Sequence, residues 1–296
     1  MMTAQSAIAR ARRDLTMGTM LKIVLLGGAL VGMFLAPVIG LGSDGGMLVM
    51  FLVIGVWVAL SIRSVKGSRL AAGSPSLIAA GQLDEAERQI ETALRTFSLF
   101  RTVKLLSLHH LALLRHAQRR YHDAATICRA LLGERLGPMS GINKQSRIIL
   151  ADALLEVGDL RGAHEAITGL YQHRLNLAEA MNLLQIELDY GSRIGAWQQM
   201  AGNLPTKVQM AELLPTPAAA RTQAMLALAA TRAGQAQWAE FLKRRVELLA
   251  DIKELTAMRP ILQELWPDQS DQPGDAPSQA NDSGIVESND PGNTST

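Results

Sequence analysis

The chain has 296 residues, of which 48% are apolar and only 4% aromatic, and its formal net charge is +2. Strand-like runs of Val, Ile and Thr do not occur outside two long apolar segments, so the composition favours an all-helical protein and argues against β structure. The single cysteine, Cys128, has no intrachain disulfide partner and falls at an apolar helix position, which predicts a buried packing residue.

The N-terminal segment predicts a membrane anchor. Residues 1–20 are polar and basic, and residues 21–41 then form an uninterrupted apolar run whose only charge is Lys22. As a helix that run would be about 31 Å long, which matches a bilayer core. After a polar turn at 42–46, residues 47–62 form a second uncharged run of about 24 Å. Together the two runs predict a two-helix transmembrane hairpin.

Basic residues flank this hairpin on one side only. Four precede or begin the first run and three follow the second, namely Arg10, Arg12, Arg13 and Lys22, then Arg63, Lys66 and Arg69. The connecting turn carries only Asp44. The positive-inside rule therefore predicts that both ends lie in the cytoplasm. By analogy with bacterial inner-membrane proteins that begin with two spans, we expect a multi-pass protein of the cell (inner) membrane. A cleaved signal peptide is the alternative, although the first run is long for one.

Residues 144–175 predict one helical hairpin. Two apolar patterns of helical period lie on either side of Gly158 and Asp159. The small residues Ala151 and Ala163 fall where two antiparallel helices must approach closely. Neither helix can bury its apolar stripe alone, so further copies are expected to stack against this pair.

The hairpin pattern recurs along the chain. The residues that open each second helix are spaced by 38, 39, 34 and 42 positions, at Ala86, Ala124, Ala163, Trp197 and Ala239. This pattern resembles the tetratricopeptide repeat family, whose unit is about 34 residues long. The resemblance covers about residues 70–250. It is clearest in the second and third copies.

The other copies depart from the pattern to different degrees. The fifth is entered through Thr216 and Pro217, a form typical of a helix start. The fourth is degenerate, because Gln185 and Trp197 stand where small residues belong. The first is half a unit, since the segment 73–75 (Gly-Ser-Pro) interrupts its first helix.

The resemblance implies an all-α fold in which a transmembrane hairpin, residues 21–62, precedes a TPR-like α-solenoid of antiparallel helix pairs, residues 63–266. In this family the first helix of each pair lines a concave surface that binds a protein or peptide. The matching positions are His109, Leu113, Gln145, Ile148, Ile149, Asp152, Asn182, Leu183, Ile186, Asp189, Met225 and Arg232. Apolar centres ringed by charge suit a peptide or a helix. Two alternatives stay open, namely that the terminal segment 260–266 fills the groove or that water does.

Catalytic motifs are weak in this sequence. Residues 40–45 match G-x-G-x-x-G but join two apolar runs instead of a strand and a helix. His109 and His116 would lie about 10.5 Å apart along a helix axis, too far to share one ion. Family members that clamp a C-terminal carboxylate use Lys and Asn where this chain has His109, Leu113 and Asp152, so that activity is not expected. We expect no catalysis, no cofactor and no metal.

The charge distribution and the C-terminal tail lead to two further expectations. The repeat region is near neutral, so neither nucleic acid nor a small-molecule substrate is expected. Residues 267–296 carry six acidic residues and no basic ones, which predicts a disordered acidic tail. We therefore expect a membrane-anchored scaffold for protein–protein interaction at the cytoplasmic face, with residues 21–62 in the lipid bilayer. The alternative is an accessory subunit of a membrane enzyme or export and assembly complex that makes contact through the hairpin.

Overall fold

The computed structural model describes residues 2–35, 42–134 and 139–267. Every regular element in these ranges is a helix and none is a strand, which confirms the prediction of an all-α chain. In chain order the helices are α1 (Ala4–Leu35), α2 (Gly42–Ala72), α3 (Ser74–Ala79), α4 (Leu83–Arg95), α5 (Arg101–Ala117), α6 (Tyr121–Leu132), α7 (Ser140–Val157), α8 (Leu160–Leu170), α9 (Leu177–Ile194), α10 (Trp197–Met200), α11 (Leu204–Glu212), α12 (Thr216–Arg232), α13 (Ala236–Leu249), α14 (Ile252–Met258) and the 3-10 helix η1 (Pro260–Leu265).

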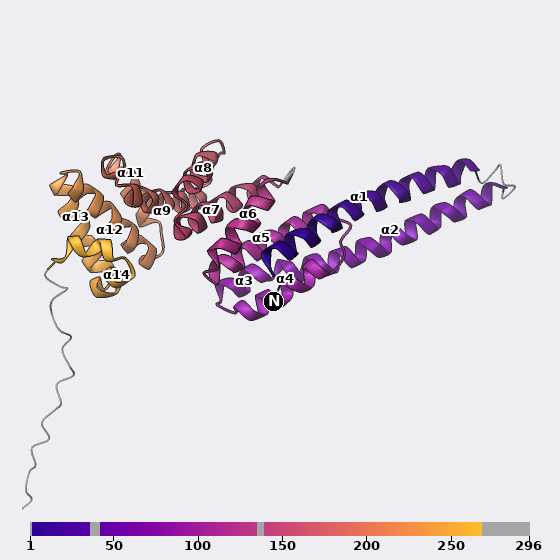
Figure 1. Ribbon diagram of the computed structural model, residues 1–296, viewed down its shortest axis with the longest axis horizontal. Coiled ribbons are helices and arrows are strands. Elements are labelled where there is room, and N and C mark those ends of the chain that lie inside the picture. The colour runs from indigo at the N-terminus through magenta and orange to yellow at the C-terminus, as the bar shows by residue number, and fades with distance from the viewer. Residues whose placement is uncertain (1, 36–41, 135–138, 268–296) are drawn as a thin grey trace, which may run out of the picture.

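The helices α1 and α2 lie side by side and project from the remaining helices, as Figure 1 shows. Their bounds differ from the predicted ones. The first helix begins at Ala4, so the basic segment 1–20 is the first half of α1 and not a separate tail. Residues 42–46, expected as a turn, are the first residues of α2, where Ser43 and Asp44 suit a helix N-terminus. Residues 36–41 lie outside the described ranges.

The first half of α1 packs into the core of the helical domain. Ala4, Ala7 and Ala11 are buried, as is Met2, and all four belong to the cluster that contains the core residues of α4 to α8. Their spacing of three and four residues puts these small side chains on one face of the helix. The domain therefore includes a helix from the extreme N-terminus, which lies against α4, α5 and α6.

The predicted helix pairs form where the sequence is most regular. Residues 144–175 fold into α7 and α8, and the break between them falls at Gly158, whose positive φ of 85° ends α7. Asp159 then caps α8 by accepting a hydrogen bond from the backbone N–H of Gly162 at 2.9 Å. Ala151 and Ala163 are fully buried, as predicted for the contact between the two helices.

The fourth pair has a broken second helix. Its two parts, α10 and α11, are separated at Asn203, which has a positive φ of 54°. The close approach expected at Gln185 occurs instead at Gly191, where an added Cβ would lie 2.7 Å from Cγ of Met200. Trp197 is too large for the small-residue position, so the contact moves along α9.

The core consists of two clusters that meet at α9. One face of α9 contributes Leu183 and Ile186 to the N-terminal cluster, and the adjoining face contributes Leu184 and Leu188 to the C-terminal one. The segment η1 packs on α12 within the second cluster. The helical domain is thus continuous from α1 to Trp266, with α9 as the element that both halves share.

Candidate functional site

A groove of about 1320 Å³ runs along the first helices of successive pairs. It is lined by side chains from α5, α7, α9 and α12, and Met258 and Arg259 stand on its rim. The 3-10 helix η1 does not line it, because Leu262 and Leu265 point into the C-terminal core. The terminal segment 260–266 therefore leaves the groove open.

The structure brings most of the predicted groove residues together. Those that line it are His109, Leu113, Gln145, Ile148, Ile149, Asp152, Asn182, Ile186, Asp189 and Met225. Leu183 does not line it, because its side chain is only 6% exposed and packs in the N-terminal core. Arg232 does not line it either, since its guanidinium pairs with Glu264 at 2.5 Å and lies over the ring of Trp197.

The apolar floor of the groove is largely buried. Ile149, Ile186 and Met225 are each below 10% exposed, so they form the base and offer little free surface. Leu113 and Ile148 are half-buried, while Asn182 is exposed. The residues that a bound chain could touch are therefore fewer than the sequence pattern predicted. A side chain on a first helix can point either into the core between stacked helices or toward the groove, and several of the predicted positions point into the core.

Charged side chains along the groove pair with one another. His116 Nε2 lies 2.7 Å from Oδ2 of Asp152, which joins α5 to α7. Arg193 donates to the backbone carbonyl of Leu155 at 2.6 Å and pairs with Asp189 at 3.1 Å, which joins α7 to α9. Arg259 also pairs with Asp189, across 70 positions of sequence. These bonds fix the curvature of the groove and leave its rim polar.

The two buried histidines have structural roles. His109 lies 3.0 Å from the hydroxyl of Ser146 and so links α5 to α7. Burial, with a smaller contribution from the neighbouring His110, lowers the pKa of His109 to about 4, so the ring is neutral near pH 7. His110 contacts the backbone carbonyl of Ala71 at 2.9 Å, where α2 ends. Among the described residues no group of three His, Cys, Asp or Glu side chains could hold a metal ion.

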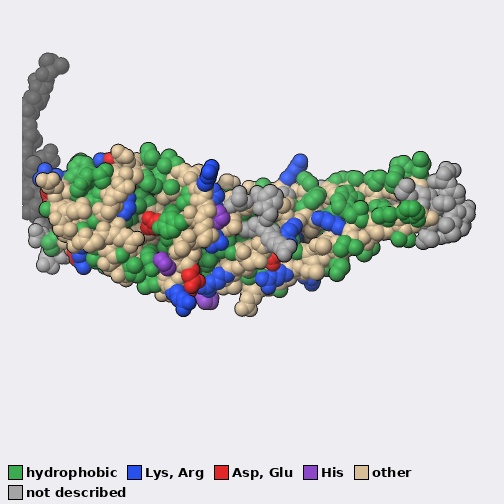
Figure 2. Space-filling model, turned by 90° about the horizontal axis from the view of Figure 1, so that it is seen from above, with side chains coloured by type: hydrophobic (Ala, Val, Ile, Leu, Met, Phe, Trp, Pro, Cys, Tyr) green, Lys and Arg blue, Asp and Glu red, His purple; other side chains and the backbone are tan. Residues whose placement is uncertain are grey.

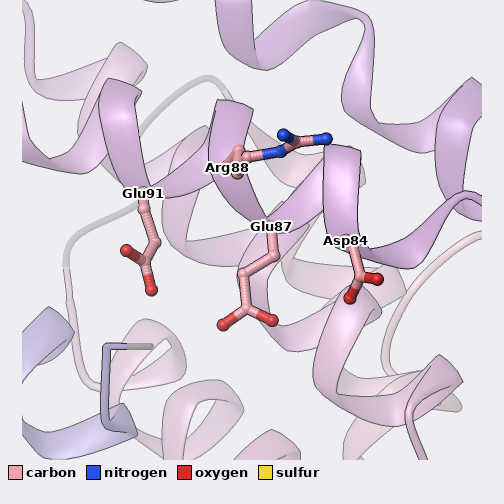
Figure 3. Close-up of a pocket in the computed structure, with 4 residues that line it drawn as sticks. All are labelled: Asp84, Glu87, Arg88 and Glu91. Carbon is pink, nitrogen blue, oxygen red and sulfur yellow. The ribbon is translucent and has the colours of Figure 1, made fainter.

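A second, smaller pocket of about 410 Å³ lies on α4 and is lined by Asp84, Glu87, Arg88 and Glu91, which Figure 3 shows. Two of its carboxylates already have partners. Glu87 accepts from Arg115 at 2.9 Å, and Glu91 accepts from the backbone N–H of Met2. The N-terminus of the chain packs at this pocket. Because Glu87 and Glu91 already accept hydrogen bonds, fewer carboxylate oxygens are available to a ligand than the three acidic residues suggest.

Comparison with known proteins adds no family. No family model matches the chain, and neither the curated proteins nor the solved structures contain a match. The functional argument therefore depends on the geometry of this molecule.

The apolar surface outside the groove is concentrated on α1 and α2. Large side chains such as Ile23, Phe34 and Phe51 are more than half exposed there. Among the described residues one helix, Ala4–Gly32, is long and apolar enough to cross a membrane, and Met50–Val65 of α2 is a shorter apolar helix. Figure 2 shows hydrophobic side chains over the projecting helices and Lys and Arg side chains where these helices meet the domain.

The sequence analysis missed the ionic contacts at the base of the projecting helices. Lys104 is fully buried, and its ammonium lies 2.7 Å from Oδ2 of Asp14 in α1. The same ammonium donates to the carbonyls of Leu94 and Thr96 at the end of α4. The signal was present in the sequence as a lone acidic residue among basic ones, followed downstream by a lysine within an apolar helix pattern.

Proposed function

We propose that this chain is a membrane-anchored scaffold whose helix-pair groove binds a peptide or a helix of another protein at the cytoplasmic face. The observation that carries the proposal is the groove itself, which four successive first helices line, with half-buried apolar side chains on α5 and α7 and buried ones on α9 and α12, beneath a paired polar rim. Such a surface suits an amphipathic segment, because apolar anchors supply affinity and the fixed charges select the partner. The arrangement of pairs is what a TPR-like solenoid would provide.

The projecting helices support the anchor. From Gly42 to Ile62 the helix α2 would be about 31 Å long, enough to span a bilayer core, and α1 runs beside it. In water this exposed apolar surface would be costly, whereas lipid tails would cover it. A multi-pass hairpin in the inner membrane, with the helical domain on the basic side, is therefore our topological proposal.

The packing of α1 argues against a cleaved signal sequence. Removing α1 would uncover the alanine face at Ala7 and Ala11 and would strip Lys104 of its carboxylate partner Asp14. An uncompensated buried charge costs several kcal/mol, on the order of 3–5, which is a large part of the stability of an ordinary domain. This packing supports the proposal that the first helix is retained.

The groove can be tested with a photo-reactive amino acid. We expect cross-linking from position 258, where Met258 is 63% exposed on the groove rim, and none from position 248, where Leu248 is 87% exposed on α13 outside the groove. Adding Ile148→Glu should reduce capture about ten- to a hundredfold, since it places a charge where an apolar anchor was buried. The control variant Leu213→Glu, whose side chain is 59% exposed and lies outside the groove, should capture normally.

Equal cross-linking from positions 258 and 248, or normal capture by a folded Ile148→Glu protein, would remove the groove from the proposal. The pair Ile149 and Leu183 is unsuitable for this test, because both side chains are buried and a charge there would unfold the domain.

A second candidate function is an accessory subunit that binds a membrane protein through the hairpin. It is favoured by the glycines of the projecting helices, since an added Cβ at Gly27, Gly28 or Gly55 would meet nothing within 4 Å. Small residues that the hairpin does not use for its own packing leave room for another helix to approach. Photo-cross-linking from position 28 but not from position 258 would favour this candidate over the groove.

A further inference from the structure

We propose that the loop between α4 and α5, residues 96–100, forms a second membrane contact that inserts into the headgroup region of the bilayer beside the hairpin. The inference rests on the proposed membrane insertion of α1 and α2. It adds an interaction surface that belongs to the helical domain and not to the hairpin. Its partner is the anionic lipid surface.

The first argument concerns the point along α1 at which the helix stops contacting the helical domain. Along α1 the contacts move outward, from Asp14 with Lys104 to Gly18, where an added Cβ would lie 3.7 Å from the carbonyl oxygen of Ser98 and 3.8 Å from that of Leu99. Met20, two residues later, is 62% exposed. The loop is thus the last part of the domain that α1 touches before its apolar surface is free.

The second argument is the matching level on α2. Ser64 accepts a hydrogen bond from the backbone N–H of Leu99 at 2.8 Å. The uncharged run of α2 ends at Ile62, which is 54% exposed. The loop therefore contacts both projecting helices within about one helical turn, or roughly 5 Å, of the point where their apolar runs begin. That distance is about the depth of the headgroup layer.

The third argument is the chemistry of the loop. Its sequence Phe97-Ser98-Leu99-Phe100 has none of the Gly, Asn, Asp and Pro residues that prevail in turns. Ser98 and Leu99 are buried, whereas Phe97 and Phe100 are half-buried and keep part of their rings accessible. Apolar rings at this depth gain from contact with the acyl chain boundary, as the aromatic and aliphatic side chains of interfacial segments do.

Several backbone N–H groups of the loop already have hydrogen-bond acceptors within the protein. The N–H of Thr96 donates to the carbonyl of Thr92 at 3.0 Å, and the N–H of Phe100 donates to the hydroxyl of Ser98 at 3.2 Å. The N–H of Leu99 already has Ser64 as its acceptor. A loop that enters the interface with three of its five N–H groups bonded avoids part of the desolvation cost that excludes open loops from membranes.

The fourth argument is charge beside the loop. Arg101 follows it directly and shares Glu134 with Arg12 of α1, at 2.9 Å and 3.4 Å. Two arginines against one glutamate leave a net positive charge, and Arg13 and Arg63 are exposed nearby on the projecting helices. Arg63 directly follows the uncharged run of α2 and so lies closest to the lipid phosphates, while Arg12 and Arg13 lie about 12–14 Å back along α1 from the start of its apolar run, and together they would attract an anionic leaflet. The apolar loop and the basic residues therefore act on the same surface.

The experiment uses the full-length protein in vesicles that contain phosphatidylcholine and phosphatidylglycerol. Phe97→Cys is labelled with an environment-sensitive fluorophore, and the same label is placed at Phe51→Cys in the hairpin and at Leu248→Cys on the far end of the domain. The wild-type chain serves as the blank, because Cys128 is fully buried and burial raises its pKa to about 12. Quenching is measured with lipids that carry a spin label either near the headgroup or deep in the acyl chain.

We expect the probe at position 97 to emit at shorter wavelength than the probe at position 248 and to be quenched by the shallow spin label. The probe at position 51 should be quenched by the deep label and the probe at 248 by neither. If position 97 behaves like 248 while 51 is quenched, the loop contact is refuted and the hairpin stands. If 51 is not quenched, the membrane proposal itself fails. Should Phe97→Cys not fold, Phe100→Cys reports on the same loop with the same expected result.

Discussion

Replacing Asp14 with alanine is expected to loosen α1 from the helical domain by about 3–5 kcal/mol. The Lys104 ammonium has no exposed surface, and besides Asp14 it contacts only uncharged carbonyls, at Leu94 and Thr96 among others. Without the carboxylate this charge is buried and uncompensated. Burial lowers the pKa of Lys104, so the lysine can also lose its proton, which for an ordinary lysine pKa of about 10.5 costs about 5 kcal/mol at pH 7. That value sets the upper limit of the loss.

Cys128 provides the assay, because it belongs to the same core as the buried face of α1 and reacts only when that core opens. A loss of about 3 kcal/mol would raise its labelling rate by a maleimide about a hundredfold. The control Glu165→Ala breaks an exposed pair with Arg161 and should change the rate by about twofold or less. An unchanged rate in Asp14→Ala would refute the reasoning. The pair Asp14→Leu with Lys104→Met should restore the slow rate, since apolar groups replace both charges.

Three further predictions concern packing, pH and topology. Ala163→Leu should overpack the fully buried contact between α7 and α8 and cost about 1–3 kcal/mol, whereas Arg161→Leu on the exposed face should cost under about 0.5, so equal melting temperatures would contradict the packing. The pKa of His109 is lowered from 6.5 to about 4, so the unfolded chain takes up the proton first and stability is lost as the pH falls through this window. Between pH 6.5 and pH 5 the loss should be about 2 kcal/mol in urea titrations, and His109→Gln should remove most of that slope. Finally, a cysteine placed at Ser288 should stay unlabelled by an impermeant thiol reagent in intact cells, and labelling there would place the tail outside.

The sequence predicts the helix pairs well because their contacts are local. Ala151 and Ala163 lie within one hairpin, so the helical period alone indicates which face each must present. The face of α1 at Ala7 is different, since its partners lie about a hundred positions downstream and no local pattern marks them. From the sequence alone, a basic N-terminal segment is therefore predicted to be a solvated tail.

The sequence also predicts the individual groove residues less well than it predicts the helix pairs. Asp152 and Asn182 line the groove, as predicted, because the first helices α7 and α9 pack side by side. Leu183 lies one position further round α9 and faces the core, since α9 contributes to both hydrophobic clusters. Which side of a helix faces a groove depends on the angle between stacked pairs, which the sequence pattern does not give.

The contact between Met2 and Arg115, whose guanidinium donates to the Met2 carbonyl across 113 positions, sets an order of events during synthesis. At about 5–20 residues per second, α1 emerges from the ribosome roughly 5–20 s before α5 and α6 are complete. For that interval its alanine face has no partner, while under the proposed anchoring the apolar half of the same helix would already be free to enter the membrane. The domain must therefore assemble around a helix that was put in place first. Chains that terminate early, before α6, would leave that helix uncovered and exposed to quality-control proteases.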